Sequence, residues 1–214
     1  MFICLHYNPT QPHQIEHGQW FADGFNRHGI KFLATPDRDQ SADIHIVSGP
    51  HYAKSRWEGD KTILLDSAYY HDEKSGKWVS TDWVSLGWLG ADGEPIFEQG
   101  EGREPPEIQE NHGTGTIFLA DYGGPYEAAD TLRYHPAEKT PPEPLPQALA
   151  RHKTAIGYKT AALVRAALMG LDVISRKPNH IINNPDWLIK LPYIDWRYDE
   201  IQSGEAWEHL WRQL

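Results

Sequence analysis

The 214-residue sequence contains a single cysteine, Cys4. One cysteine excludes an intramolecular disulfide and any metal site built from several thiolates. No apolar run approaches the roughly 18 residues that a membrane-spanning helix needs. The opening residues, MFICLHYNPT, have neither the basic start nor the small-residue cleavage site of a signal peptide. We therefore expect a soluble protein of a reducing cytoplasm with no membrane partner.

Two phosphate-binding sequence motifs are also missing. The chain has no G-x-x-x-x-G-K-[ST] pattern, which argues against a P-loop nucleotidase. It has no G-x-G-x-x-G after its first apolar segment, so the usual dinucleotide fingerprint is absent. No internal repeat of 20 to 50 residues and no low-complexity tract is found.

The charge is negative overall but unevenly distributed. The formal net charge is −10, which argues against indiscriminate binding of nucleic acid. Residues 91–147 contain twelve Asp or Glu and three Lys or Arg, whereas residues 147–181 contain six Lys or Arg and one acid. An acidic protein with one basic zone suits a small phosphorylated ligand better than a long polyanion. Nine Trp and ten Tyr residues serve core packing, and such rings also stack on sugars and nucleobases.

Residues 1–98 have the pattern of an open α/β sheet. The apolar segment Phe2–Tyr7 predicts a strand, and residues 14–27 predict a helix whose inner face carries Ile15, Trp20, Phe21 and Phe25. Further strands are expected in IKFLAT from Ile30, ADIHIVSG from Ala42 and KTILLDSAYY from Lys61. Residues 78–97 alternate well enough to form either a hairpin or an irregular aromatic loop. A β-α-β-β start of this kind predicts a sheet whose strand ends open onto a ligand site.

Composition divides the rest of the chain into three parts. Residues 99–115 are charged and rich in Gly and Pro, which predicts a linker. Residues 116–184 predict a second half with strands at TIFLA, LRYHP, KTAIGY and LDVIS. Helices are expected near residues 126–131, 147–151 and 159–169. Residues 185–214 predict two or three Trp-rich helices that pack on the body of the protein.

The segment HQIEH places two histidines and a glutamate within one helical turn. It matches the H-x-x-E-H pattern of inverted zinc peptidases, in which His13 and His17 would bind zinc and Glu16 would act as base. No downstream acid stands out as a third ligand. Because twelve histidines make a chance match unsurprising, we favour helix-face residues over a metal site here.

Two segments of the second half suit a phosphate. In RYHP a strand ends in Arg133 and His135 before a proline, and a cationic or hydrogen-bonding pair there fits an anion. In GYKTAAL, Gly157 permits a close approach, Lys159 adds charge and Thr160 can cap a helix. An ordinary loop-edge ion pair and an ordinary amphipathic helix remain alternative interpretations.

Taken together, these segments resemble the donor-binding half of GT-B glycosyltransferases. The matching positions are Arg133, His135 and Pro136, then Tyr158, Lys159 and Thr160, with Gly170 and Val173 at the following turn. LLDSAYY, VSLGWLG and DEIQSGEAWEHL also resemble segments of phage-encoded, DNA-modifying glycosyltransferases. Two departures are Lys159, where small or hydroxyl residues are usual, and Leu171-Asp172, where (V/I)-P is common.

The resemblance implies an α/β fold of two small Rossmann-like halves with a crevice between them and a helical C-terminal tail. It implies transfer of a sugar from a nucleotide-sugar donor, with a UDP-sugar expected, to a hydroxyl acceptor, suggested to be hydroxymethylated pyrimidine in phage DNA. The cell compartment would then be the cytoplasm of a bacterial host. The implied donor-binding residues are Arg133, His135, Gly157, Tyr158, Lys159 and Thr160.

An inverting transfer needs a general base, for which Asp66 is the first choice and His51 the second. Acceptor contacts are expected from Asn8 and Tyr69. No metal or cofactor is expected, because the only D-x-D match, at Asp37, precedes polar loop residues. The stereochemical outcome stays open. Two other hypotheses also remain, a non-catalytic nucleotide- or partner-binding α/β protein and a zinc hydrolase.

Overall fold

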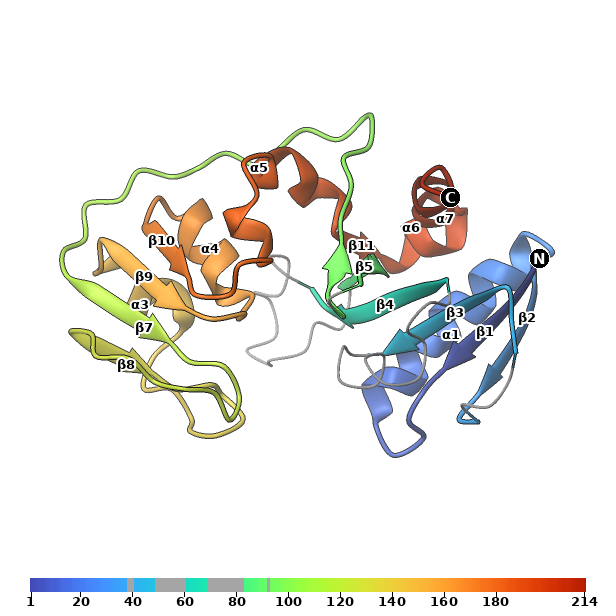
Figure 1. Ribbon diagram of the computed structural model, residues 1–214, viewed down its shortest axis with the longest axis horizontal. Coiled ribbons are helices and arrows are strands. Elements are labelled where there is room, and N and C mark those ends of the chain that lie inside the picture. The colour runs from blue at the N-terminus through green and yellow to red at the C-terminus, as the bar shows by residue number, and fades with distance from the viewer. Residues whose placement is uncertain (38–40, 49–60, 69–82, 92) are drawn as a thin grey trace. The chain divides into compact units, whose positions relative to one another are not determined.

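The computed structural model describes residues 1–37, 41–48, 61–68, 83–91 and 93–214 (Figure 1). These residues form two compact units. The first is built within Met1–Asp72, Val79–Gly102 and Tyr193–Leu214, and the second contains Arg103–Pro192. The sequence predicts C-terminal helices over residues 185–214 that pack on the body of the protein. In the structure, the chain from Tyr193 onward belongs to the first unit, since it packs into that unit's core and adds a strand to its sheet.

The first unit contains a mixed sheet in the order β11-β5-β4-β3-β1-β2, with β6 paired to β5. Strands β1 to β4 run parallel, and β5 is antiparallel to β4, β6 and β11. Nearly every residue of β1 and β3 is buried, as expected for parallel strands covered on both faces. The strand bounds are β1 Phe2–His6, β2 Lys31–Thr35, β3 Ile44–Ser48, β4 Thr62–Ser67, β5 Trp83–Leu89, β6 Pro95–Ile96 and β11 Asp195–Arg197.

Helix α1 (Pro12–Arg27) begins with a proline at its first turn and ends before Gly29, which has φ +64°. Its buried stripe has the 3.6-residue period and consists of His17, Trp20, Phe21, Gly24 and Phe25. Ile15 was expected on this face but is 48% exposed, because it lies two residues, about 200° of helix rotation, from His17.

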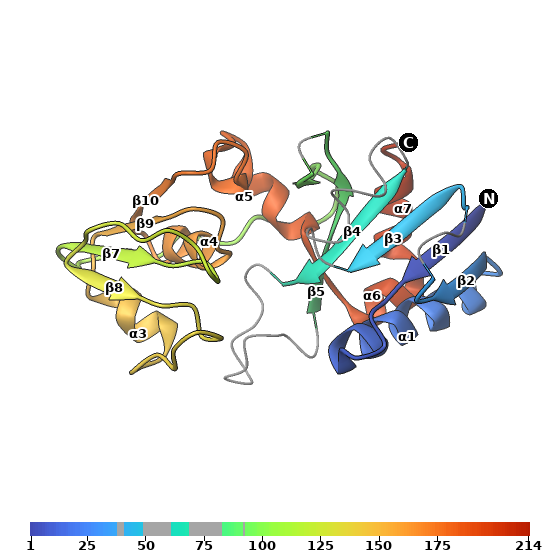
Figure 2. The same ribbon diagram turned by 60° about the horizontal axis from the view of Figure 1, so that its bottom comes forward.

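The end of the chain covers α1. Helices α6 (Tyr198–Ser203) and α7 (Glu205–Trp211) follow β11, and α6 packs beside α1 under the strands (Figure 2). The Trp207 ring lies 4.9 Å from the Phe21 ring and 4.7 Å from the Phe25 ring, measured between centroids. The predicted packing of the Trp-rich tail is thus confirmed for Trp207 and Leu210.

The second unit contains a four-stranded parallel sheet in the order β10-β9-β7-β8. Its strands are β7 Thr116–Leu119, β8 Thr131–Arg133, β9 Thr154–Gly157 and β10 Asp172–Ser175. Helices α3 (Leu145–Ala150) and α4 (Ala162–Leu168) join the later strands, and both contribute to one apolar cluster with Ile117, Leu119 and Ala155. Both helices therefore cover the same face of this sheet. Before the chain returns to the first unit, it forms η1 Ile181–Asn183, α5 Trp187–Lys190 and η2 Leu191–Tyr193.

The four parallel strands of each unit follow the same order. Numbered within its own unit, each set reads 2-1-3-4, an order that occurs among doubly wound α/β folds. The mixed α/β class predicted from the sequence is confirmed. No helix in the described parts of the chain is long and apolar enough to cross a membrane.

The helix expected near residues 126–131 is absent. This segment is an irregular loop followed by β8, and none of its residues is buried. A short helix without an apolar face has nothing to stabilise it in water. The polar side chains of this loop instead bond to distant residues, as Tyr126 does to Glu138 at 3.2 Å.

Candidate functional site

The topology of the second unit singles out the carboxyl ends of β7 and β9. The chain leaves β7 towards β8 on one side, and it enters β9 on the other, so the strand order reverses between β7 and β9. In open α/β sheets, ligands bind outside the carboxyl ends of the strands at such a point. The residues that follow β7 are Ala120, Asp121, Tyr122, Gly123 and Gly124, and those that follow β9 are Tyr158, Lys159 and Thr160.

Asp121 links these two strand ends. Its side chain is only 9% exposed, and its Oδ2 accepts a hydrogen bond from the backbone N–H of Lys159 at 3.0 Å. The backbone turns at once after it, because Gly124 donates its N–H to the Asp121 carbonyl at 3.2 Å. Gly123 within this turn has φ +62°, a conformation that favours glycine. The sequence DYGG thus holds a buried carboxylate at the strand end.

Lys159, Lys177 and His135 act electrostatically on this carboxylate from the other strand ends. Burial is the largest effect and raises the pKa of Asp121. The N–H and charge of Lys159, then the charges of His135 and Lys177, act in the opposite direction and only partly offset it. His135 follows β8 and Lys177 follows β10, so every strand of the sheet contributes one group. We call Asp121, His135, Lys159 and Lys177 the edge site.

The hydrogen bonds of His135 define its tautomer. Its Nδ1 accepts the backbone N–H of Ala137 at 3.2 Å, so Nε2 carries the ring hydrogen. The ring also meets Tyr122 edge-on, at 5.8 Å between centroids. His135 is therefore an oriented N–H donor beside Asp121, even when its ring is neutral.

Tyr158 is tied into the structure around the edge site. Its hydroxyl hydrogen-bonds Glu127, and its carbonyl accepts the Ser175 hydroxyl at 2.6 Å. Arg176 donates to both oxygens of Glu127, at 2.8 and 3.0 Å, and lowers the pKa of that carboxyl. These contacts join the loop after β7 to the ends of β9 and β10.

Gly157 and Thr160 have local structural roles. A Cβ on Gly157 would lie 2.8 Å from the carbonyl oxygen of Leu119, so glycine is needed where β9 passes β7. Helix α4 begins at Ala162, three residues later than expected. The Thr160 hydroxyl accepts the N–H of Ala162 at 3.3 Å and stabilises the turn into this short helix. The side chain of Lys159 is exposed beside Asp121.

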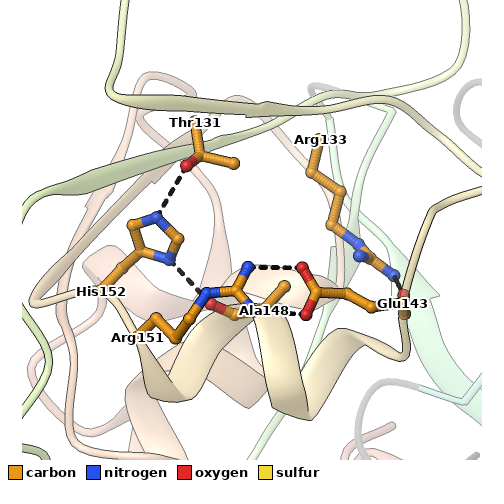
Figure 3. Close-up of polar contacts among 6 residues, drawn as sticks. All are labelled: Thr131, Arg133, Glu143, Ala148, Arg151 and His152. Atoms are coloured by element: carbon orange, nitrogen blue, oxygen red, sulfur yellow. Dashed lines mark hydrogen bonds and ion pairs between the residues drawn. The ribbon is translucent and has the colours of Figure 1, made fainter.

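The Arg133 side chain binds the proline-rich loop rather than the edge site to which His135 belongs. It donates to the carbonyl of Glu143 at 3.0 Å, as Figure 3 shows, and partial burial lowers its pKa. In the same region, Arg151 forms a two-pronged ion pair with the Glu143 carboxylate (Figure 3). Arg133 thus anchors the proline-rich loop, and it is absent from the charges that act on Asp121.

Two of the four residues proposed for the acceptor side are described. Asp66 is exposed one residue before the end of β4, opposite Ser85 of β5. Asn8 forms a turn before α1, because its Oδ1 accepts from the backbone N–H and the hydroxyl of Thr10 at 3.0 and 2.8 Å. His51 and Tyr69 lie outside the described residues.

The HQIEH segment lies on the first turns of α1. The rings of His13 and His17 are 6.0 Å apart, His17 is buried, and Glu16 is exposed. Within the part of the chain that the structure describes, no group of three His, Cys, Asp or Glu residues is placed to hold a metal ion.

The sequence interpretation missed Asp121 and Lys177. A polar residue between a buried strand and two glycines was the available signal for Asp121, whereas nothing local marked Lys177. It also missed a buried pair in the first unit, in which His6 Nε2 and His45 Nδ1 are 2.9 Å apart. No protein-family model, curated protein or solved structure matches this chain.

Proposed function

We propose that the edge site binds the phosphate groups of a nucleotide-sugar and that the protein is a compact glycosyltransferase of the GT-B type. The observation that carries the proposal is that Lys159, His135 and Lys177 each follow the carboxyl end of a strand in the parallel sheet whose order reverses between β7 and β9. Two ammonium groups and an oriented imidazole N–H suit phosphate oxygens. The net charge of −10 favours a small phosphorylated ligand over extended polyanions.

The GT-B arrangement, with donor and acceptor on different halves, is part of this proposal. It is supported by the common 2-1-3-4 order of the parallel strands in the two units. Its donor would be a UDP-sugar, held by the second unit. Its acceptor would be a hydroxyl group, with hydroxymethylated pyrimidine in DNA as the first candidate and Asp66 as the general base. No metal or other cofactor is required by this proposal.

The contribution of the edge site can be tested with two lysines that flank strand β9. Lys153 is exposed at the amino end of β9, and Lys159 follows its carboxyl end. Lys159→Met should weaken UDP binding by about ten- to a hundredfold, because a hydrogen bond to a charged group contributes about 1.5–3 kcal/mol. Lys153→Met should leave it unchanged. Equal effects of both substitutions on calorimetric binding would contradict a phosphate site at the carboxyl edge.

Transfer itself is tested by incubating the protein with UDP- and GDP-sugars and DNA that contains hydroxymethylcytosine. Mass spectrometry of the digested nucleosides should detect one added sugar, and Asp66→Asn should reduce the rate while UDP binding persists. UDP binding without added mass would instead support a non-catalytic nucleotide-binding protein. No added mass with any donor, together with no thermal shift from nucleotides, would exclude both.

A further inference from the structure

Asp121 places a negatively charged side chain within a site proposed to bind an anion. Among the described residues its carboxylate accepts one hydrogen bond, at Oδ2 from the N–H of Lys159. That N–H and the charges of Lys159, Lys177 and His135 are the groups that a phosphate would use. In the structure, the carboxylate is therefore the negative partner of the site.

A bound phosphate would compete with the buried Asp121 carboxylate for the Lys159 N–H and for the charges of the edge site. Phosphate oxygens within hydrogen-bond distance of the Lys159 backbone N–H would approach the Asp121 carboxylate closely, because that N–H lies 3.0 Å from Asp121 Oδ2. A second negative charge next to a buried carboxylate raises the pKa of that carboxyl and favours its protonated form. Asp121 is 9% exposed, so solvent screens this repulsion poorly.

We propose that Asp121 makes phosphate binding at the edge site proton-coupled: the ligand binds together with one proton, which Asp121 takes up. The protonated carboxyl keeps an oxygen that accepts the Lys159 N–H, and its O–H becomes a donor to the phosphate. The same side chain thus neutralises the cations in the free protein and hydrogen-bonds the anion in the complex. This inference rests on the part of the proposed function that places phosphate at the edge site.

The direction of the pH effect follows from this coupling. Burial already raises the pKa of free Asp121, and a bound anion raises it further. Between these two pKa values, affinity should increase as the pH falls, by at most about tenfold per pH unit for one proton. The charged or titratable groups that act electrostatically on Asp121 are Lys159 after β9, His135 after β8 and Lys177 after β10. The variant His135→Gln removes the imidazole of the edge site, so that the contribution of Asp121 can be measured separately.

The test is titration calorimetry with UDP and with inorganic pyrophosphate from pH 6 to 8, in two buffers that differ in ionisation heat. The proteins are the wild type, Asp121→Asn, His135→Gln and the double variant. Asn still accepts the Lys159 N–H, and thermal unfolding verifies that each variant is folded. Comparing Asp121→Asn with the wild type cancels the ionisation of the ligand itself.

The wild type and His135→Gln should take up more protons per ligand than their Asp121→Asn counterparts, with one proton as the upper limit of the difference. At pH 8, Asp121→Asn should bind UDP about tenfold more tightly than the wild type, because the competing charge is gone. Weaker binding by Asp121→Asn, or equal proton uptake with and without Asp121, would overturn the inference and leave the phosphate site standing. A requirement of UDP binding for Mg²⁺ that disappears in Asp121→Asn would also overturn the inference, since the carboxylate would then be a metal ligand.

The outcomes separate this inference from the proposed function. Pyrophosphate binding with proton uptake but no sugar transfer would support the coupling and refute the transferase. Absence of binding by either probe to any variant would refute both.

Discussion

Two glycines on helix α1 offer a test of how the end of the chain packs on its beginning. A Cβ on Gly18 would lie 3.7 Å from the Leu5 side chain, which is an ordinary van der Waals contact. A Cβ on Gly24 would lie 2.8 Å from the carbonyl oxygen of Ile201 in α6, which is closer than real contacts allow. The same substitution to alanine should therefore have opposite effects six residues apart.

The magnitudes follow from two terms. Replacing a glycine inside a helix by alanine stabilises the helix by about 0.8–1 kcal/mol, and this gain is common to both variants. Gly24→Ala must in addition displace the α6 backbone, and overpacking of this kind costs about 1–3 kcal/mol. We expect Gly18→Ala to raise the free energy of unfolding by about 1 kcal/mol. Gly24→Ala should fall about 1–3 kcal/mol below Gly18→Ala, because the shared gain cancels in this comparison.

The assay is urea unfolding, monitored by tryptophan fluorescence and far-UV circular dichroism. The slope of the unfolding free energy with urea should stay unchanged, so that the midpoint reports stability. Because the chain has two units, the transition that shifts should be the one in which the environment of the buried Trp207 changes. Stabilisation of equal size by both alanines would refute the packing of α6 against Gly24.

Two further predictions concern the second unit. Thr131→Val should destabilise the second unit by about 1–3 kcal/mol in urea unfolding, because the Nε2 of buried His152 loses its hydroxyl partner at 2.8 Å (Figure 3). The control is Thr140→Val, at an exposed loop position. Equal losses of unfolding free energy in the two variants would contradict the role of this hydrogen bond. Glu127→Gln should reduce the decrease in unfolding free energy at acidic pH, because Arg176 holds the folded-state pKa of Glu127 below its unfolded value. The stabilisation from the Glu127–Arg176 pair is complete above about pH 4.5 and disappears as the pH falls through the lowered pKa. The measurement is the free energy of unfolding from pH 3 to 6, and the same pH dependence in the wild type and the variant would refute this prediction.

Local sequence patterns predicted most elements of the fold. Each parallel strand begins within two residues of its expected start, because short apolar runs bounded by polar or glycine residues mark most of them. Strand β11 was missed, because three residues carry no alternation and only pairing with β5 defines it. The loop at residues 126–131 was misassigned because helix propensity alone cannot show that no apolar face is buried.

The candidate site was only partly predictable for a related reason. His135 and Lys159 stand out beside motif-like prolines and glycines, and both belong to the edge site. Asp121 and Lys177 are 56 residues apart in sequence and come together only through the order of four strands. Arg133 shows the reverse case, since its position beside His135 suggested an anion contact but its guanidinium bonds to the Glu143 carbonyl.

The contribution of Tyr193–Leu214 to the first unit has a consequence for biosynthesis. Strand β11 and the aromatic side chains of α7 are the last parts of this sequence to be made, yet they complete the core that begins at Ile3. The segment Arg103–Pro192 is continuous and has its own apolar cluster, so it can fold before β11 of the first unit has been synthesised. On the ribosome, the unit whose synthesis starts first is therefore the one that finishes folding last.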